Sequence, residues 1–446
     1  MADSSSMLIY SLQPGPRLKY ILEFFSNEIF DQPIQLTTDL QAFINYNGAK
    51  INYGTARNSE KEFWIYSVDL LFERGVKPTV IRCFEINGNK AFFQNNAGDF
   101  AFDIFAAAFY LLSRYEEYLP HTKDKYGRYA HSNALACKES FLHLPLINYW
   151  LSDFKKALLR QYPGLKFKGK IFCLQPSYDI DIAWSYRNKG WWRTIGGFLR
   201  SAIKLDWYTC RERVEVLMNK KKDPFDAYGW LHTIHTLTGL KAVYFFLIAN
   251  RQEGYDKNTS PDKNELQQLI KEHDARYITG IHPSWQSGDD DKLLKQEIEM
   301  LGQFVGHDIN YSRQHYLRFT LPATYQKLIS LGIRNDYSMG YGTINGFRAS
   351  VASSYLWYDL ENEKATNLLI HPFCFMDANA FYELKFSPAQ ALEELINFYG
   401  CIKEIDGLMI TLWHNNFLGT DRNFAGWQKM YESFLVNIIS DKSIKD

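Results

Sequence analysis

Short apolar runs alternate with amphipathic stretches through the C-terminal three-fifths of the chain. Two of the amphipathic stretches have a helical period: one spans 291–305 after two acidic residues, and the other starts at Ser387-Pro388, a cap followed by a first-turn proline. This alternation of strands and helices predicts a parallel α/β layer or barrel. The predicted strands are 170–174, 242–248, 278–282, 368–371 and 408–412.

The N-terminal part of the chain has a different pattern. Residues 103–112 are nearly all apolar and run into the charged segment 113–118, which predicts a buried helix that emerges at the surface. The apolar segment 142–150 is its expected packing partner. A turn-rich basic stretch, 161–170, then separates the two patterned regions. We therefore predict a smaller N-terminal α/β domain, 1–165, and a second α/β domain, 166–446.

Polar residues with catalytic potential follow the predicted strands. In parallel α/β folds, ligand sites gather at the carboxyl ends of strands. A single carboxylate or imidazole there is usually a cap or a hydrogen-bonded polar residue, but several at one rim favour a shared site. The candidates are Asp179, Asp181, His282, His371 and His414.

The first two carboxylates suggest a cation site. In extended backbone Asp179 and Asp181 point to one side, so one can bind a divalent metal while the other takes a proton from water. A cap with a salt bridge explains the pair equally well. His282 is a good partial ligand and His414 could protonate a leaving amine, although a hydrogen-bonded loop histidine and a core histidine are the ordinary alternatives.

The order of these segments resembles the polysaccharide-deacetylase family, whose members share the NodB homology domain. Ser177–Asp181 is similar to its Asp-x-Asp motif, which implies that Asp179 is the catalytic base and Asp181 a metal ligand. His282-Pro-Ser-Trp-Gln286 is similar to the second motif, in which two histidines bind metal. The resemblance thus implies that His282 is a ligand, with Gln286 in the place of the second histidine.

Three further segments carry the resemblance. Tyr311–Tyr316 is similar to the Arg-x-Pro-Tyr motif, which implies that Arg313 orients Asp179 and that the Tyr316 amide faces the oxyanion. Asn335–Tyr337 is similar to the fourth motif and implies that Asp336 tunes the catalytic histidine. Leu412-Trp-His414 is similar to the fifth motif, with His414 as the acid.

The resemblance implies a fold, an activity and a cofactor. The fold is a distorted (β/α) barrel of the NodB type, and the activity is hydrolysis of an N-acetyl group on a sugar or saccharide. The cofactor is a divalent metal, with zinc as the first expectation and cobalt, nickel, manganese or magnesium as alternatives. Walls for a sugar ring are expected from Trp285, Tyr337 and Trp413, although core packing explains each equally well.

An additional N-terminal domain also fits this resemblance. Segments 113–118 and 127–128 resemble such a domain in a cytoplasmic-type branch of the family, as do 346–348 and 376–377 in its barrel. No chemistry is expected from the N-terminal domain, and a scaffold or partner surface is the preferred interpretation.

Charge and composition narrow the partners. Fifty basic residues balance fifty acidic ones, so the whole chain offers no electrostatic basis for binding nucleic acid. No secretory signal or apolar run long enough to span a bilayer is found, and the six scattered cysteines have no Cys-x-x-Cys pair. We expect a cytoplasmic protein without a membrane segment, and the oligomeric state stays open.

Two other functions compete with a deacetylase. Because Gln286 replaces a histidine, the chain could be a catalytically inactive descendant that binds glycans or acts as a scaffold. A barrel glycoside hydrolase could instead pair Asp179 or Asp181 with a distant acid such as Glu253 or Asp377, but would leave His282 and His414 unexplained.

Overall fold

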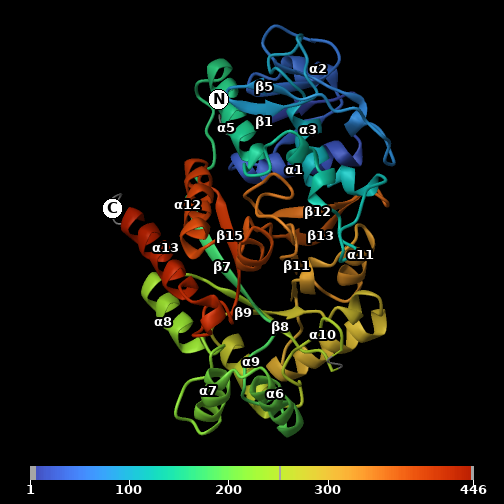
Figure 1. Ribbon diagram of the computed structural model, residues 1–446. Coiled ribbons are helices and arrows are strands. Elements are labelled where there is room, and N and C mark those ends of the chain that lie inside the picture. Colours follow the sequence, from blue (N-terminus) through green and yellow to red (C-terminus); the bar gives the residue numbers. More distant parts are fainter. Residues whose placement is uncertain (1–6, 251–252, 443–446) are drawn as a thin grey trace.

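The computed structural model describes residues 7–250 and 253–442, and its chain begins with a four-stranded parallel sheet (Figure 1). The strand order is β2-β1-β3-β4. Helices α1, α3 and α5 pack beside this sheet, which gives the N-terminal unit the predicted α/β character. The bounds are β1 Met7–Tyr10, α1 Pro16–Ile29, β2 Gln35–Thr37, α2 Leu40–Asn45, β3 Ala49–Gly54, β4 Phe63–Tyr66, α3 Ile104–Leu112 and α5 Leu146–Gln161, with a hairpin of β5 Phe84–Ile86 and β6 Asn89–Ala91.

Helix α3 confirms the helix predicted at 103–112. All nine of its residues are buried, and Asp103 caps it by accepting a hydrogen bond from the Ala106 amide at 2.9 Å. The same carboxylate accepts a bond from the Tyr53 hydroxyl at 2.8 Å. Burial raises the pKa of Asp103 to about 6. This cap therefore ties the start of the buried helix to the N-terminal sheet.

A nine-stranded sheet forms the rest of the molecule, in the order β12-β13-β11-β10-β9-β8-β7-β15-β14. All pairings are parallel except β12 with β13. In the described chain β13 pairs with β12 and not with β14, so no closed barrel forms. The bounds are β7 Cys173–Ile180, β8 Val243–Leu247, β9 Ile278–His282, β10 Tyr311–Ser312, β11 Asn335–Asp336, β12 Tyr355–Asp359, β13 Lys364–Ile370, β14 Phe375–Met376 and β15 Leu408–His414.

The strand predicted at 170–174 is misplaced, because β7 starts at Cys173 and continues to Ile180. The helices α10 and α12 begin as predicted: Asp290 caps the first, and Ser387 forms a capping box with Gln390 on the second. The helices of this part are α6 Trp191–Ile203, α7 Trp207–Leu217, α8 Tyr228–Thr238, α9 Asn264–Asp274, α10 Asp291–Val305, α11 Ala323–Ser330, α12 Pro388–Glu404 and α13 Trp427–Lys442.

The N-terminal unit packs closely on the larger sheet. One hydrophobic core runs from Met7 to Ile438, and the Tyr20 hydroxyl on α1 donates to the Leu356 carbonyl of β12 at 2.7 Å. Buried charges cross the same boundary: Glu117 accepts bonds from both Arg114 and Arg348. The predicted division at 165 follows α5, and the two parts share one interior.

Two further expectations from the sequence concern membrane-spanning helices and the cysteines. No helix in the described residues is long and apolar enough to cross a membrane. The six cysteines are free thiols: Cys210 and Cys374 are buried, Cys173 is exposed, and the other three are half-buried.

A candidate metal and catalytic site

The carboxyl ends of β7 and β15 bring the first candidates together. The two strands are parallel neighbours in which His414 lies opposite Asp179. On the other side of β7, strands β8 and β9 follow, with His282 at the end of β9. This pairing places residues from three distant parts of the sequence at one edge of the sheet, as predicted.

A cluster of one carboxylate and two imidazoles lies at this edge. The Oδ1 atom of Asp181 is 3.2 Å from Nε2 of His282, and its Oδ2 atom is 3.8 Å from Nε2 of His315. One ligand atom from each of these residues lies within 4.8 Å of the others. Two imidazoles and one carboxylate are a common ligand set for zinc and other transition metals.

The hydrogen bonds behind the imidazoles fix their tautomers. Nδ1 of His282 lies 2.5 Å from the Arg313 carbonyl oxygen, which can only accept, so Nδ1 carries the proton. In the neutral ring, Nε2 then turns a lone pair toward Asp181. Since Asp181 Oδ1 is buried and has no hydrogen-bond partner, two electron pairs face each other there. A cation between them would satisfy both.

The imidazole of His315 is held in the same way. Its Nδ1 atom is 2.9 Å from Oδ1 of Asp256, a fully buried carboxylate that also accepts a bond from the Trp285 amide at 2.8 Å. Burial lowers the pKa of His315, but Asp181 and Asp256 outweigh it and raise the value to about 9. Burial opposes ionisation of Asp181 too, yet the charge of His315 holds its pKa well below the usual range.

Asp179 lies beside this cluster and is anchored by an arginine. Its Oδ1 atom accepts a bond from Nη1 of Arg313 at 2.8 Å, and Oδ2 is 3.6 Å from Nε2 of His282. Arg313 also donates to the Ser177 hydroxyl and the Tyr337 carbonyl. The contact expected from Arg313 is therefore present, and it leaves one oxygen of Asp179 directed toward the cluster.

His414 completes the edge, with Nε2 3.9 Å from Asp181 Oδ2. Its Nδ1 atom lies 2.6 Å from Oδ1 of Asp377, whose other oxygen accepts a bond from the His414 amide at 2.6 Å. Burial lowers the pKa of His414, but Asp377 outweighs it and raises the value to about 10. The ring is thus held as an imidazolium that can donate a proton from Nε2.

The prediction that Asp336 tunes His414 is wrong. Asp336 is buried and accepts bonds from Ser312 Oγ at 2.9 Å and the Tyr325 hydroxyl at 3.0 Å. Strand β14 runs beside β15, so Asp377 follows it next to His414, whereas β11 lies on the far side of β7. His371 is also separate from the site: it stacks on Tyr337, and burial, aided by Arg313, lowers its pKa to about 3.

The three residues of the cluster, together with Asp179 and His414, line one cavity of about 750 Å³. None of the expected sugar walls, Trp285, Tyr337 and Trp413, is among the residues that line it, whereas Tyr316 is. Trp413 is fully buried because it precedes His414 on β15, and neighbouring side chains of a strand face opposite sides. Tyr337 is equally buried. The cavity residues include Asp179, Asp181, His282, His315, Tyr316, Met376, Tyr382 and His414.

Gln286 is not among the residues that line the cavity. It begins a short 3-10 turn after Trp285, while His315 completes the cluster with Asp181 and His282. The third side chain of the cluster therefore comes from the third motif, where His315 stands in place of proline. This substitution was visible in the sequence, but its proximity to Asp181 was not.

The N-terminal unit supplies part of the cavity wall. Tyr126 and Arg128 line it, and Arg128 Nη1 donates to the Tyr316 carbonyl at 2.7 Å. Tyr316 itself has a left-handed backbone with φ 57°, which this bond helps to hold. The Tyr126 ring lies 5.3 Å from that of Tyr316 and 6.1 Å from that of Trp285, which backs the wall without lining it. The pattern of the sequence contained no signal for this contribution.

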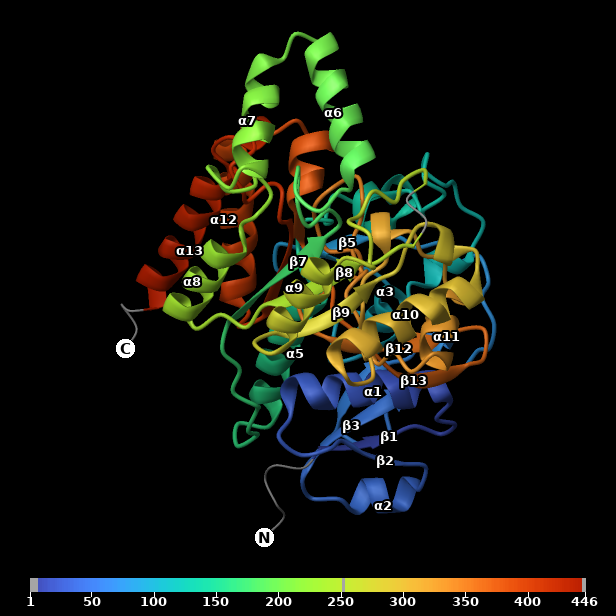
Figure 2. The ribbon, with the colours of Figure 1, turned by 90° about the horizontal axis from the view of Figure 1, so that it is seen from below.

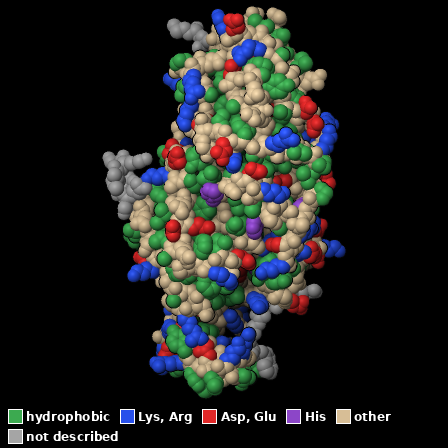
Figure 3. All heavy atoms as spheres, turned by 45° about the horizontal axis from the view of Figure 1, so that its top comes forward, with side chains coloured by type: hydrophobic (Ala, Val, Ile, Leu, Met, Phe, Trp, Pro, Cys, Tyr) green, Lys and Arg blue, Asp and Glu red, His purple; other side chains and the backbone are tan. Residues whose placement is uncertain are grey.

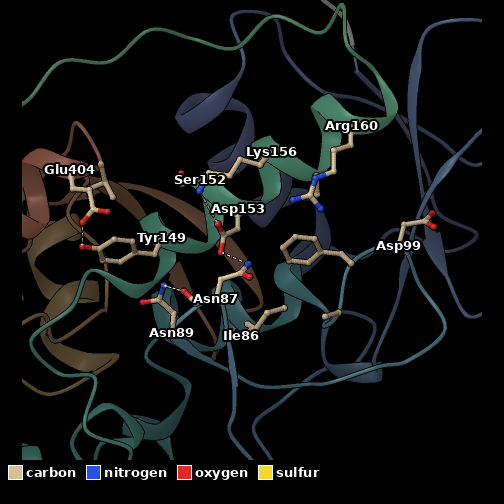
Figure 4. A pocket seen from close by; sticks show the side chains of 14 residues that line it. Ile86, Asn87, Asn89, Asp99, Tyr149, Ser152, Asp153, Lys156, Arg160 and Glu404 are labelled. Carbon is tan, nitrogen blue, oxygen red and sulfur yellow. Dashed lines mark hydrogen bonds and ion pairs between the residues drawn. The ribbon is translucent and has the colours of Figure 1, made fainter.

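A second cavity, of about 620 Å³, lies between α5, the β5–β6 hairpin and the end of α12 (Figure 4). Its acidic groups have partners: Asp153 accepts from Asn87 at 3.0 Å, and Glu404 accepts from the Tyr149 hydroxyl at 3.0 Å. No histidine or cysteine is among its lining residues. The first cavity is therefore the candidate catalytic site.

Comparison with known proteins gives a family of unknown function and distant structural likenesses. The family model DUF7033 matches residues 7–163, and no curated protein matches the chain. A provisionally assigned polysaccharide deacetylase of Mycobacterium smegmatis is 14% identical over 61% of this chain and 85% of its own, with a TM-score of 0.39. The Bc1974 polysaccharide deacetylase of Bacillus cereus is 10% identical over 62% of this chain and 89% of its own, with a TM-score of 0.31. Puue allantoinase is 10% identical over 59% of this chain and 83% of its own, with a TM-score of 0.36. Likenesses of this size carry no assignment, so the function below is proposed from the geometry of the site.

Proposed function

We propose that this chain is a metal-dependent hydrolase that removes an N-acetyl group from a sugar or saccharide. One observation carries the proposal: a three-residue ligand cluster lies between a carboxylate anchored by arginine and an imidazolium anchored by carboxylate, all in one cavity. Amide hydrolysis requires a base to activate water and an acid to protonate the leaving amine. The two sides of the cluster offer these groups.

The ligands for the metal are Asp181, His282 and His315. Their donor set suits zinc, cobalt, nickel or manganese better than magnesium, which prefers oxygen ligands alone. The unpartnered Asp181 Oδ1 and the fixed tautomer of His282 support the fit. When bound, a divalent cation would polarise the acetamide carbonyl and make water more acidic.

Asp179 is the proposed base. With Oδ1 held by Arg313, its Oδ2 atom can take a proton from a water molecule in the cavity. The oxygen of that water adds to the carbonyl carbon of the acetamide. Arg313 is a positioning residue in this step, because it is fully buried and reaches the reaction only through Asp179.

His414 is the proposed acid. Its Nε2 atom faces the same cavity, and Asp377 keeps the ring in the charged form. As the carbon–nitrogen bond breaks, the proton on Nε2 passes to the departing amine, which leaves acetate and an amino sugar. The base and the acid are thus anchored by different neighbours, Arg313 for one and Asp377 for the other.

A saccharide is the substrate that the walls favour. Tyr126, Tyr316 and Tyr382 line the cavity and present apolar ring surface together with hydroxyl groups. Such side chains contact the alternating apolar and polar faces of sugar rings. The identity of the sugar stays open in this proposal.

Acetate release tests the proposal. The purified chain, stripped with chelator and reloaded with zinc, cobalt, nickel or manganese, is expected to release acetate from oligomers of N-acetylglucosamine. Asp179→Asn should keep its metal and lose about 10²–10⁴-fold in kcat. Asp289→Asn changes an exposed carboxylate outside the cavity and serves as the matched control. If the metal-loaded chain releases no acetate from any N-acetylated sugar, the proposal fails.

The two competing functions lose support at specific residues. The inactive alternative rested on Gln286, and His315 supplies the third side chain of the cluster. The glycoside hydrolase alternative needed Glu253 or Asp377 as an acid, but Glu253 does not line the cavity and Asp377 is fully buried against His414. A deacetylase uses all of the assembled groups.

A further inference from the structure

Helices α6 and α7 form a hairpin that projects from the body of the molecule (Figure 2). It follows the strand that carries Asp179, and Ile182, nine residues before the hairpin, lines the catalytic cavity. No step of the proposed hydrolysis uses the hairpin, so its surface calls for a separate explanation.

An exposed apolar stripe runs along α6. Ile195, Leu199 and Ile203 recur every four residues and have exposed fractions of 47%, 56% and 82%. A stripe of this spacing normally faces the core of a globular protein. Other large apolar side chains of this region are exposed as well. They are Trp191 and Phe198 on α6, and Leu205, Trp207, Leu217 and Met218 beyond it.

The protein already covers the other face of α6. A side chain at Gly197 would collide with the Arg213 guanidinium of α7, and the Ser201 carbonyl accepts a bond from the Asp206 amide at 2.9 Å. Arg213 also reaches the Thr194 carbonyl. Because α7 packs on this small and polar face, the apolar stripe is left toward the solvent.

The hairpin is also strongly basic. Segment 189–222 contains nine Lys or Arg and three Asp or Glu, a formal charge of +6 in a chain whose total is zero. Glu215 is paired with Arg211 at 2.7 Å, and Glu212 with Lys221. Arg200 on α6 and Lys204, directly after its last residue, are exposed, and each follows a member of the apolar stripe. In Figure 3 blue basic and green apolar side chains mix at the lower end of the molecule.

We propose that the α6–α7 hairpin binds the surface of a bilayer that contains anionic lipids. Tryptophan, phenylalanine and leucine beside a concentration of Lys and Arg are the composition of helices that lie in the membrane interface. The apolar stripe would enter the boundary between headgroups and acyl chains, while Arg200 and Lys204 contact lipid phosphates. Binding to an anionic bilayer needs exposed apolar side chains and basic side chains, and the hairpin provides both.

This docking would bring the bilayer near the catalytic cavity. The segments that flank the hairpin are tied to the strand ends of the site: the Asn415 side chain, next to His414, donates to the carbonyls of Ile182, before α6, and Phe225, after α7. If the proposed deacetylation holds, the substrate class is a saccharide attached to a membrane lipid. That assignment rests on the proposed function, whereas the binding to membranes does not.

Co-sedimentation with vesicles tests the binding on the chelator-treated full chain, without substrate. The chain is expected to pellet with vesicles that contain phosphatidylglycerol, to pellet poorly with phosphatidylcholine alone, and to dissociate as salt is added. Arg200→Gln with Lys204→Gln should weaken partitioning by roughly fivefold for each charge. The matched control is Lys292→Gln with Lys295→Gln, which removes two exposed charges from α10.

The apolar contribution has its own pair of variants. Phe198→Ser with Leu199→Ser should abolish pelleting while the thermal transition by circular dichroism stays unchanged. Ile171→Ser with Leu237→Ser removes two exposed apolar residues elsewhere and should bind as the original chain does. Absence of pelleting with the vesicles that contain phosphatidylglycerol overturns the proposal. The proposal is also overturned if the chain is a dimer in solution and the variant Phe198→Ser with Leu199→Ser is a monomer. The apolar stripe would then join two copies of the chain.

Discussion

Nδ1 of His315 lies 2.9 Å from Oδ1 of the buried Asp256, and this contact directs the opposite nitrogen of the ring toward Asp181. The same arrangement, a histidine held from behind by an oxygen acceptor, occurs at His282 with the Arg313 carbonyl. Acceptors behind the ring raise the basicity of a ligating imidazole and fix its orientation. Both imidazoles are therefore prepared for a cation that Asp181 would share.

His315, not Gln286, is expected to hold the metal. Loss of a residue that supports a metal ligand already lowers metal affinity by about 10–100-fold. His315→Ala removes a direct ligand, so it should lower the affinity by at least that amount. Gln286→Ala should bind metal as the original chain does. Metal content after dialysis, measured by atomic emission, together with titration calorimetry, checks both. A loss of metal in Gln286→Ala with retention in His315→Ala would show that the ligand set is misassigned.

The alkaline limit of activity should depend on Asp377. His414 must be protonated to act as an acid, so the rate falls as the pH rises through its pKa. Asp377→Asn removes the charge that raises this pKa, and the alkaline limb should move to lower pH with a loss in kcat. A pH profile of kcat measures the shift.

Asp336→Asn is the matched control for that profile. Asp336 is buried but bonds to Ser312, Ser338 and Tyr325 rather than to His414. Its replacement should cost about 1–3 kcal/mol in the free energy of unfolding and leave the alkaline limb in place. A limb that moves in Asp336→Asn and stays fixed in Asp377→Asn would restore the assignment made from the sequence.

The residues after β9 and β15 could be predicted because these strands are long enough to have a pattern, and the predicted strand 170–174, although placed too early for β7, led to the two aspartates by the same pattern. Asp179, Asp181, His282 and His414 followed directly from it. His315 and Asp377, in contrast, come after strands of only two residues, Tyr311–Ser312 and Phe375–Met376. Such strands have no periodicity, and only the pairing of the sheet places their last residues beside Asp181 and His414.

The predicted and observed walls of the cavity differ at Trp413 and Tyr126, for two separate physical reasons. Trp413 could have been excluded as a sugar wall, because strand alternation places it opposite to its neighbour His414. Tyr126 could not have been included, since Arg128 and Tyr316 are 188 residues apart and meet only through the packing of the N-terminal unit. The order of segments along a chain does not contain that contact.

Tyr126 should contribute to substrate binding and not to chemistry. Tyr126→Ala removes a ring from the cavity wall, so KM for an N-acetylated oligosaccharide should rise about three- to tenfold, the size of one aromatic contact. Metal content and kcat should stay the same. Tyr66→Ala, which removes a tyrosine of the N-terminal sheet outside the cavity, should leave KM unchanged. An unaltered KM in Tyr126→Ala would exclude this part of the N-terminal unit from the substrate site.

Glu117 should dominate the pH dependence of the contact between the N-terminal unit and the larger sheet. Burial raises its pKa, but Arg348 and Arg114 outweigh it and lower the value to about 2. A lowered pKa stabilises the fold above the unfolded value of about 4.3, and the stabilisation, about 3 kcal/mol, is lost as the pH falls toward 2. Glu117→Gln should cost about 3–5 kcal/mol near neutral pH, because two guanidinium groups lose their buried partner, and should flatten this dependence. Urea denaturation across that range tests it against Glu73→Gln, which removes an exposed pair with Lys77 and should cost under about 1 kcal/mol. Equal losses in the two variants would contradict a structural role for the buried network.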